Sequence, residues 1–488
     1  MPEDHHPGPS LQAREGNGSA RAEWEAVIGM EVHAQLATRS KMFCGCSADY
    51  LAAPPNSSVC EVCLGMPGTL PVVNRRAVEL VVTTGLALGC EIARHTKFDR
   101  KNYFYPDLPK GYQISQYDLP LCLRGAVEVG GRTVRITRVH LEEDTGKLLH
   151  AGDALHTASE SLVDLNRSGV PLMEIVTEPD LHSADDARDY AMALRAILRA
   201  IGASEADMEK GQLRAEANVS VRRRGAEELG VKTELKNINS FRALHRAVEH
   251  EIRRQVELLE RGEPVVQETR GWSEAEQRTF PQRSKEYAQD YRYFPEPDLP
   301  PLELDPAWVD ALRASLPELP AARRSRLVAV YGIPEYDAEL LTEEAATADL
   351  FEAAVAAGAP AKQVANWIIA THPTLDGTRL ADLIGLVVAG TINREQGLQV
   401  LEEAQATGRT PGDIVRERGL SQVSDESALA EIVDRVIAEN PQAVADIRAG
   451  KDKAIGPLVG KVVQATGRAA NPQVANRMLR SRIVTPPE

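Results

Sequence analysis

The fold is decided by an early stretch of the chain, Val27-Ile28-Gly29-Met30-Glu31-Val32-His33-Ala34-Gln35-Leu36. Apolar and polar residues roughly alternate from Ala26 to Leu36, and this period of two is typical of a strand with one buried face. Because side chains two residues apart point to the same side of a strand, Glu31 and His33 share a face. The stretch therefore predicts a strand that presents an acid and an imidazole on one face of a sheet.

Similar patterns follow along the chain and extend this core. Roughly alternating residues predict strands at Val134–Glu143 and Ala215–Val221. Amphipathic spacing predicts helices at Ala184–Ile201 and from about Phe241 to Arg261, each followed by a glycine. Strands and helices mixed in this way indicate an α+β domain.

Composition is that of an ordinary soluble globular protein, with 43% hydrophobic and 26% charged residues in 488. This length favours several domains. No apolar run approaches the roughly 18 residues of a membrane span. Residues 1–23 lack the apolar segment of a signal peptide and are expected to form a disordered extension. We therefore expect a cytoplasmic protein with no membrane attachment.

Two breaks in the sequence suggest the domain boundaries. Five prolines among the fourteen residues Tyr293–Pro306 can neither continue a helix nor occupy a central strand. They predict a boundary between a mixed domain at 24–294 and a helical domain at 295–407. Glycines and a proline after residue 407 predict a hinge before a small helical tail at 408–484.

Four of the six cysteines are clustered, as Cys44-Gly45-Cys46 and Cys60-Glu61-Val62-Cys63. Thiolates on two tight turns can surround a tetrahedral Zn²⁺, and four sulfurs leave no open position for chemistry. The alternatives are small core residues or two incidental pairs. We interpret the loop 44–63 as a structural zinc site.

Acidic residues recur on the predicted strands: Glu142, Glu143, Glu216, Glu234 and Glu268, in addition to Glu31. Each acid taken alone more often lies on a solvated face. Acids that share a sheet face repel one another unless a cation compensates them. A hard divalent cation that also bridges phosphate oxygens would do so, namely Mg²⁺, or Mn²⁺ because histidine is a less usual magnesium ligand.

The sequence contains no G-x₄-G-K-[ST] phosphate loop and no G-x-G-x-x-G after a strand. Phosphate would have to be held by metal and by scattered bases such as Arg100, Lys101, Arg138 and Lys236, each of which taken alone is more often a surface charge. It also has no G-x-S-x-G elbow. If nitrogen is transferred, we expect another chain to generate it.

Several blocks of the sequence resemble the B subunit of the tRNA-dependent amidotransferases that act on Asp-tRNA(Asn) and Glu-tRNA(Gln). The resemblance runs from about residue 24 to 484. The blocks that carry it are Val27–Leu36, Phe98–Asp107, His140–Gly146, Asp164–Arg167, Glu234–Asn237 and Asp290–Asp298.

The resemblance implies a fold and an activity. The fold would be a glutamine-synthetase-like cradle on a mainly antiparallel sheet, followed by an all-α domain and a small α-helical tail that binds tRNA. The enzyme would use ATP and Mg²⁺ to phosphorylate the side-chain carboxylate of Asp or Glu misattached to tRNA, and ammonia would then form the amide. An amidase-type A subunit would supply the ammonia from glutamine, and a small C subunit would complete the heterotrimer.

The resemblance also implies site residues. The metal and kinase-site positions fall on Glu31, His33, Lys101, Glu143, Glu216 and Glu234, with Glu142 as a competitor of Glu143. Among the scattered bases named above, Arg100, Lys101 and Lys236 are the candidates for nucleotide binding. Strand parity leaves the choice between Glu142 and Glu143 open, since His140 and Glu142 share a face while Glu143 points away.

A basic segment closes the chain, although the net charge is −15 and excludes a generally basic nucleic-acid coat. The cations that could meet tRNA phosphates are Lys451, Lys453, Lys461, Arg468, Arg477, Arg480 and Arg482. The alternative is a solvated helical face.

Two rival functions share some of these features. A free-standing ligase of the glutamine-synthetase type would share the metal site but act on a small acid without tRNA. A zinc-containing tRNA adaptor would have no chemistry, and its acids would be surface charges.

Overall fold

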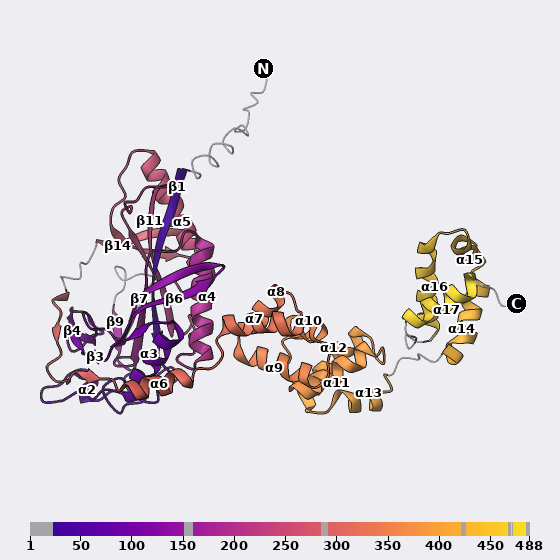
Figure 1. The fold of residues 1–488 in the computed structure, drawn as a ribbon, viewed down its shortest axis with the longest axis horizontal. Coiled ribbons are helices and arrows are strands. Elements are labelled where there is room, and N and C mark those ends of the chain that lie inside the picture. Colours follow the sequence, from indigo (N-terminus) through magenta and orange to yellow (C-terminus); the bar gives the residue numbers. More distant parts are fainter. Residues whose placement is uncertain are drawn as a thin grey trace, which may run out of the picture. The chain divides into compact units, whose positions relative to one another are not determined.

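A large sheet organises the N-terminal part of the protein (Figure 1). The computed structural model describes residues 23–150, 160–284, 291–420, 426–466, 470 and 472–484. These residues divide into two compact units, and the boundary falls between Leu319 and Pro320. The nine strands of the sheet run in the order β14-β13-β12-β11-β1-β10-β7-β6-β2. Neighbouring strands are antiparallel, apart from the parallel pair of β12 and β13.

The strands of the large sheet are β1 (Trp24–Gln35), β2 (Glu91–Ile92), β6 (Cys122–Val129), β7 (Arg132–Glu143), β10 (Pro171–Thr177), β11 (Leu213–Arg223), β12 (Thr233–Lys236), β13 (Glu268–Ser273) and β14 (Arg278–Ser284). Smaller sheets pair β15 (Phe294–Pro295), β4 (Asp99–Asn102) and β5 (Tyr112–Ser115), β16 (Leu302–Glu303) with β3 (His95–Thr96), and β8 (Lys147–His150) with β9 (Ser161–Asp164). The three strands predicted from alternation are confirmed as β1, β7 and β11.

Helices cover one face of the large sheet. They are α3 (Arg75–Ala87), α4 (Ala184–Ala200) and α5 (Phe241–Glu260), which contact β7, β1 and β11 respectively (Figure 1). The two predicted helices are confirmed as α4 and α5. The Ser183 side chain accepts a hydrogen bond from the Asp186 backbone amide, 3.0 Å away, and so caps α4.

Burial alternates along β1 as the sequence predicts. Ile28, Met30, Val32 and Ala34 are 0–1% exposed and belong to the core of the N-terminal unit. That core also contains Leu194 of α4 and Leu244 of α5. The opposite side of β1 is therefore left for the polar residues at odd positions.

The proline-rich segment does not end the first unit. β15 pairs with β4, β16 pairs with β3, and α6 (Pro306–Ala314) contacts α3. Val309 is buried in the core of the N-terminal unit, which extends to Leu319. The boundary predicted at 294/295 thus needs correction, because the prolines interrupt regular structure while the chain continues to pack on the same core.

The C-terminal unit contains two helical cores. The first comprises α7 (Pro320–Tyr331), α8 (Glu335–Thr342), α9 (Ala345–Ala356), α10 (Ala361–Thr371), α11 (Gly377–Val388), α12 (Arg394–Thr407) and α13 (Pro411–Arg418). The second comprises α14 (Glu426–Glu439), α15 (Pro441–Arg448), α16 (Ile455–Ala465) and α17 (Pro472–Val484), with the 3₁₀ turn η3 (Asp452–Ala454) between α15 and α16.

The predicted hinge at residue 408 is placed differently by the structure. Ile414 and Val415 of α13 are buried in the first helical core, together with residues of α11 and α12. The second core begins at Leu429, in α14. Within the described residues, no helix combines the length and apolarity needed to cross a bilayer.

We expect Leu194→Ala to destabilise the N-terminal unit. Leu194 is 0% exposed between α4 and the sheet, and deleting a buried leucine side chain costs about 2–5 kcal/mol of unfolding free energy. Met192→Ala on the same helix is the matched control, because Met192 is 37% exposed. Urea unfolding followed by tryptophan fluorescence compares the two, and equal losses would contradict the proposed core packing.

Candidate functional site

Strand register brings distant polar residues into rows on the open face of the large sheet. His33 of β1 stands opposite Glu174 of β10, and Glu174 stands opposite His140 of β7. On the other side of β1, Glu31 stands opposite Glu216 of β11. Antiparallel partners directly opposite one another have neighbouring side chains.

Three overlapping groups of acids and histidines result, each with ligand atoms within 4.8 Å of one another. We call their members together the Glu/His cluster: Glu31, His33, His140, Glu142, Glu174, Glu216 and Glu234. They come from β1, β7, β10, β11 and β12. Glu31 and Glu174 each belong to two of the groups, so the cluster is continuous.

His33 lies at the centre of the acids. Its Nε2 atom is 3.3 Å from a Glu174 oxygen, 3.5 Å from Glu142 and 3.8 Å from Glu31. These distances exceed the 2.7–3.2 Å of ordinary N–H···O hydrogen bonds. One imidazole therefore faces three carboxylates, and its shortest contact, a long hydrogen bond, is with Glu174.

Burial and neighbouring charge set the protonation of the cluster. Burial, followed by the charge of Glu174, raises the pKa of Glu31 to about 7. Burial would lower the pKa of His33, but the hydrogen bond and charge of Glu174, with Glu142 and Glu31, raise it to about 9. Without another cation, the cluster thus retains protons at neutral pH.

The two most buried acids remain ionised. Burial would raise the pKa of Glu142, but a hydrogen bond donated by His140 and the charge of Lys101 lower it. Burial opposes ionisation of Glu174 as well, yet the charge of His140 and the hydrogen bond from His33 hold its pKa well below the usual range. Each buried carboxylate is therefore stabilised by positive charge beside it.

Two lysines predicted as site residues interact electrostatically with the cluster. Lys236 of β12 places its ammonium 2.6 Å from Glu216 and 3.3 Å from Glu234. Burial would lower the pKa of Lys101 on β4, but the nearby charge of Glu142 raises it. The Lys101 ammonium also lies 4.8 Å from the centre of the Tyr291 ring. Arg138 of β7 is 3.6 Å from Glu174.

The donor set fits a divalent cation. It combines carboxylate oxygens with imidazole nitrogens, which suits Mg²⁺ or Mn²⁺ more than a soft metal. The Nε2 atom of His33 lies 3.3 Å from an oxygen of Glu174 and 3.5 Å from one of Glu142, separations that ligands of one ion can have. The residues that could hold such an ion are Glu31, His33, His140, Glu142, Glu174, Glu216 and Glu234.

The structure does not bring three of the singled-out residues to the cluster. Glu143 lies at the end of β7, where its carboxylate pairs with Lys110 and accepts a hydrogen bond from the Ile114 amide, 2.9 Å away. Arg100 forms two hydrogen bonds with Glu296, of 2.7 and 2.8 Å. Because neighbouring side chains on a strand point in opposite directions, Glu143 points away from Glu142, and Arg100 points away from Lys101. Glu268 is engaged by Arg270.

Sequence reasoning missed Glu174 and did not assign a role to His140. Glu174 had a signal, since it is the one charged residue in the apolar run Val170–Val176, in the same way that Glu31 interrupts β1. Its membership of the cluster depends on the pairing of β10 with both β1 and β7, which the sequence pattern does not specify.

The clustered cysteines converge as the spacing predicts. Cys63 Sγ lies 3.6 Å from Cys44, 3.8 Å from Cys60 and 3.9 Å from Cys46. Tetrahedral ligands about 2.3 Å from one zinc would be roughly 3.8 Å apart. The buried Lys41 ammonium lies 3.5 Å from Cys63 Sγ and would balance thiolate charge. These cysteines form a group that could hold a metal ion.

The basic residues of the tail lie on α16, α17 and the turn before them. Lys451, Lys453, Lys461, Arg477 and Arg480 are exposed, and Arg482 is half-buried. Some of these charges are paired: Arg480 with Asp452 and Lys451 with Asp446, both at 3.0 Å, and Arg482 with Asp434. Arg468 lies outside the described residues.

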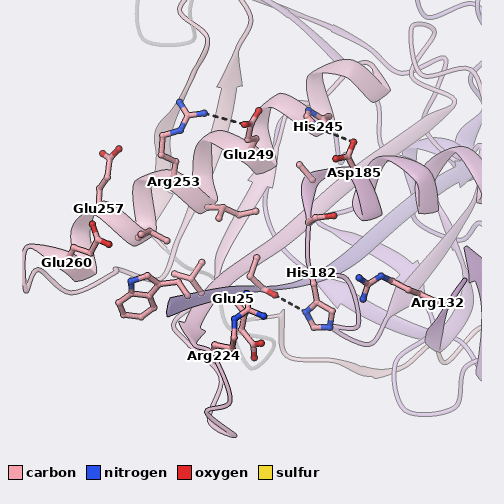
Figure 2. Close-up of a pocket in the computed structure, with 17 residues that line it drawn as sticks. Glu25, Arg132, His182, Asp185, Arg224, His245, Glu249, Arg253, Glu257 and Glu260 are labelled. Atoms are coloured by element: carbon pink, nitrogen blue, oxygen red, sulfur yellow. Dashed lines mark hydrogen bonds and ion pairs between the residues drawn. The ribbon is translucent and has the colours of Figure 1, made fainter. Parts of the chain in front are cut away.

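A cavity of about 700 Å³ opens elsewhere in the N-terminal unit, where residues of α4, α5 and the start of β1 line it (Figure 2). Several of its charged lining residues are paired, with His245 3.3 Å from Asp185 and Arg253 3.6 Å from Glu249. The His182 ring is 2.9 Å from the Ala26 carbonyl. None of its lining residues belongs to the Glu/His cluster.

Comparison with known proteins agrees with this arrangement. Residues 26–310 match the family model described as the GatB/GatE catalytic domain, and residues 371–483 match the GatB domain. The first match contains every member of the Glu/His cluster, and the second contains the basic part of the tail.

Full-length relatives are also similar. The chain is 54% identical to the B subunit of aspartyl/glutamyl-tRNA(Asn/Gln) amidotransferase from Thermomicrobium roseum, over 96% of this chain and 100% of the relative. It is 52% identical to the corresponding protein of Moorella thermoacetica, over 94% of this chain and 100% of the relative. Matches of this length and identity establish that the chain belongs to the family of aspartyl/glutamyl-tRNA(Asn/Gln) amidotransferase B subunits.

Proposed function

We propose that this protein converts Asp or Glu misattached to tRNA(Asn) or tRNA(Gln) into the amide, with ATP as the activating substrate. The observation that carries the proposal is the convergence of five carboxylates and two histidines from five strands on one sheet face. Family membership supports the same reaction, since the relatives are named as subunits of such an amidotransferase. We expect the protein to work in the cytoplasm.

The reaction needs activation because a carboxylate is a poor electrophile whose leaving group would be oxide. Phosphorylation of the side-chain carboxylate supplies a good leaving group, and ammonia then displaces phosphate to give the amide. A divalent cation on the cluster would neutralise charge as two anions approach. Glu31, His33, Glu142 and Glu174 would hold it, with Glu216 and Glu234 extending the site to β12.

Two lysines of the cluster are suited to the phosphoryl group. The charge of Glu142 outweighs the effect of burial on Lys101, and the raised pKa keeps the ammonium charged. Lys236 is likewise kept charged, since the charge of Glu216 and Glu234 outweighs the effect of burial. Positive charge placed where anionic oxygens meet lowers the barrier to phosphoryl transfer. A carboxylate of the cluster would take a proton from ammonium before the attack.

Other components of the reaction would come from partners. An amidase-type A subunit would hydrolyse glutamine and deliver ammonia, and a small C subunit would complete the heterotrimer. The relatives are named as one subunit of an amidotransferase, which supports assembly with other chains. The basic residues of α16 and α17 would contact tRNA phosphates. The metal held by the four cysteines would be a structural Zn²⁺.

One experiment tests the whole proposal. The chain is combined with its A and C partners, γ-labelled ATP, Mg²⁺ and Glu-tRNA(Gln) or Asp-tRNA(Asn). We expect release of labelled phosphate only when the mischarged tRNA is present, and loss of that release after ribonuclease treatment. Phosphate release with free glutamate alone would instead favour a ligase that acts on a small acid.

Glu142→Gln tests the choice between neighbouring acids. The amide keeps the shape of the side chain but removes a charge from the cluster, so we expect phosphate release to fall by at least about 100-fold. Glu143→Gln is the matched control: it weakens the pair with Lys110, so we expect a lower melting temperature with a rate close to that of the wild type. The opposite pattern would place Glu143 in the reaction.

Cys63→Ser tests the zinc site. Cys63 contacts the three other sulfurs, so its loss should reduce bound zinc from about one ion per chain, the expectation for one Cys₄ site, towards none. Elemental analysis of the purified chain measures this. Cys122→Ser is the control, because Cys122 is buried in the sheet core away from the cluster and should leave the zinc content unchanged. Full zinc retention in Cys63→Ser would rule out the assignment.

A further inference from the structure

A basic cavity adjoins the Glu/His cluster and shares one residue with it. The cavity measures about 340 Å³, and Glu216 forms part of its wall. Four cationic side chains line it: Lys147, Arg167, Lys210 and Arg214. The acids in the lining are Glu209 and Glu216. Its excess of positive charge contrasts with the acidic cluster beside it and favours an anionic ligand.

A buried carboxylate positions two of these cations. Asp144 is 3% exposed, and its oxygens lie 3.2 and 3.3 Å from the two terminal nitrogens of Arg214. Arg167 lies 3.8 Å from the same carboxylate and donates to the Thr145 carbonyl, 2.9 Å away. Gln35 donates to Asp144 at 2.8 Å. One acid thus orients two guanidinium groups and leaves a net positive charge at the wall.

The guanidinium of Arg214 retains binding capacity in this arrangement. It carries five N–H donors in a fixed fork, and a single carboxylate cannot engage all of them. Such a group suits phosphate oxygens, which accept several hydrogen bonds at once. Its position is set by residue pairing and not by the ligand, so little ordering would be needed on binding.

Among the four cations of the cavity, Lys147 has the fewest interactions with other described residues. It begins β8, where its side chain is exposed, and no hydrogen bond or ion pair of its ammonium is found among the described residues 23–150, 160–284 and 291–319. Lys210, in contrast, pairs with Asp207 at 3.2 Å. An ammonium that has no partner among those described residues and lines a basic cavity can engage a ligand.

The lining of the cavity also contains uncharged polar groups. Asn237 and Asn239 follow β12 and line the cavity, together with Tyr50 and Leu51. Side-chain amides both donate and accept hydrogen bonds, so they can engage a sugar hydroxyl or a base edge. Asn237 adopts a φ of +60°, in the left-handed region that asparagine tolerates better than most residues. The cavity therefore combines cations for phosphate with amides for the rest of a nucleotide.

We infer that this cavity binds a nucleotide through its phosphate oxygens and directs the reacting end of that ligand past Glu216 to the Glu/His cluster. The inference rests on the proposed function and adds a substrate subsite to it. Two reactants carry this chemistry: ATP, and the 3′-terminal nucleotides of the aminoacyl-tRNA. In either case Arg214 and Lys147 contact phosphate, and Asp144 is a positioning residue.

Lys147→Gln in the complete complex with its A and C partners tests the inference. The KM for ATP is measured at saturating aminoacyl-tRNA, and the KM for aminoacyl-tRNA at saturating ATP. We expect one of the two KM values to rise by about 3- to 10-fold, the effect of losing one charge-assisted contact, while kcat is retained. Lys147→Arg should restore most of the affinity. Arg76→Gln, on α3 and 52% exposed, is the control and should change neither KM.

The two sources give different results. A higher KM for aminoacyl-tRNA, with the salt dependence of binding reduced by about one unit of slope, identifies the acceptor end as the ligand. A higher KM for ATP alone identifies ATP as the ligand of the cavity. If both KM values match those of the wild type, the inference is overturned. Failure of the proposed function is distinct: the wild-type complex would release no phosphate, and direct titration of the full chain with ATP or tRNA would then test the cavity.

Discussion

Carboxylates that share one side of the sheet repel one another, and the Glu/His cluster can exist only because positive charge offsets this repulsion. Glu142 and Glu174 are almost fully buried, and Glu31 lies beside them on the same face. Burying several like charges is unfavourable unless cations compensate them. The protein supplies Lys101, Lys236, Arg138 and a protonated His33, but the pKa of Glu31 is still raised to about 7. Repulsion among these acids lowers the stability of the protein when no ligand is bound. The cluster is therefore suited to a ligand of opposite charge.

The pairing of strands holds the acids in place against that repulsion. β1 is central in the sheet, and its even-numbered side packs into the apolar core beside α4 while its odd-numbered side carries Glu31 and His33. A shift of one residue in register would move the apolar residues outward and the polar residues into the core. The large apolar core therefore specifies the register, and the register in turn specifies which polar residues meet. In this way packing on one face determines chemistry on the other.

Local sequence patterns predicted the individual strands and helices of this fold better than they predicted how the strands pair and where the units end. Alternation predicted β1, β7 and β11, and apolar spacing predicted α4 and α5, because each pattern reports burial of a single element. The part played by Glu174 was missed, since it requires knowing that β10 lies between β1 and β7. The domain boundary was misplaced for a similar reason: prolines reveal where regular structure stops, but not where the chain packs next. The cysteine spacing succeeded because its partners are close in sequence.

Arg100 and Lys101 illustrate how structural and functional roles are divided between neighbours. Arg100 binds Glu296 through two hydrogen bonds, and Phe294 of β15 pairs with Arg100 of β4. These contacts fix β4 against the segment that follows residue 294, which explains why that segment belongs to the N-terminal unit. Because neighbouring side chains on a strand point in opposite directions, anchoring Arg100 on one side holds Lys101 towards the cluster on the other. The hydrogen bonds between Arg100 and Glu296 thus anchor the strand that carries Lys101.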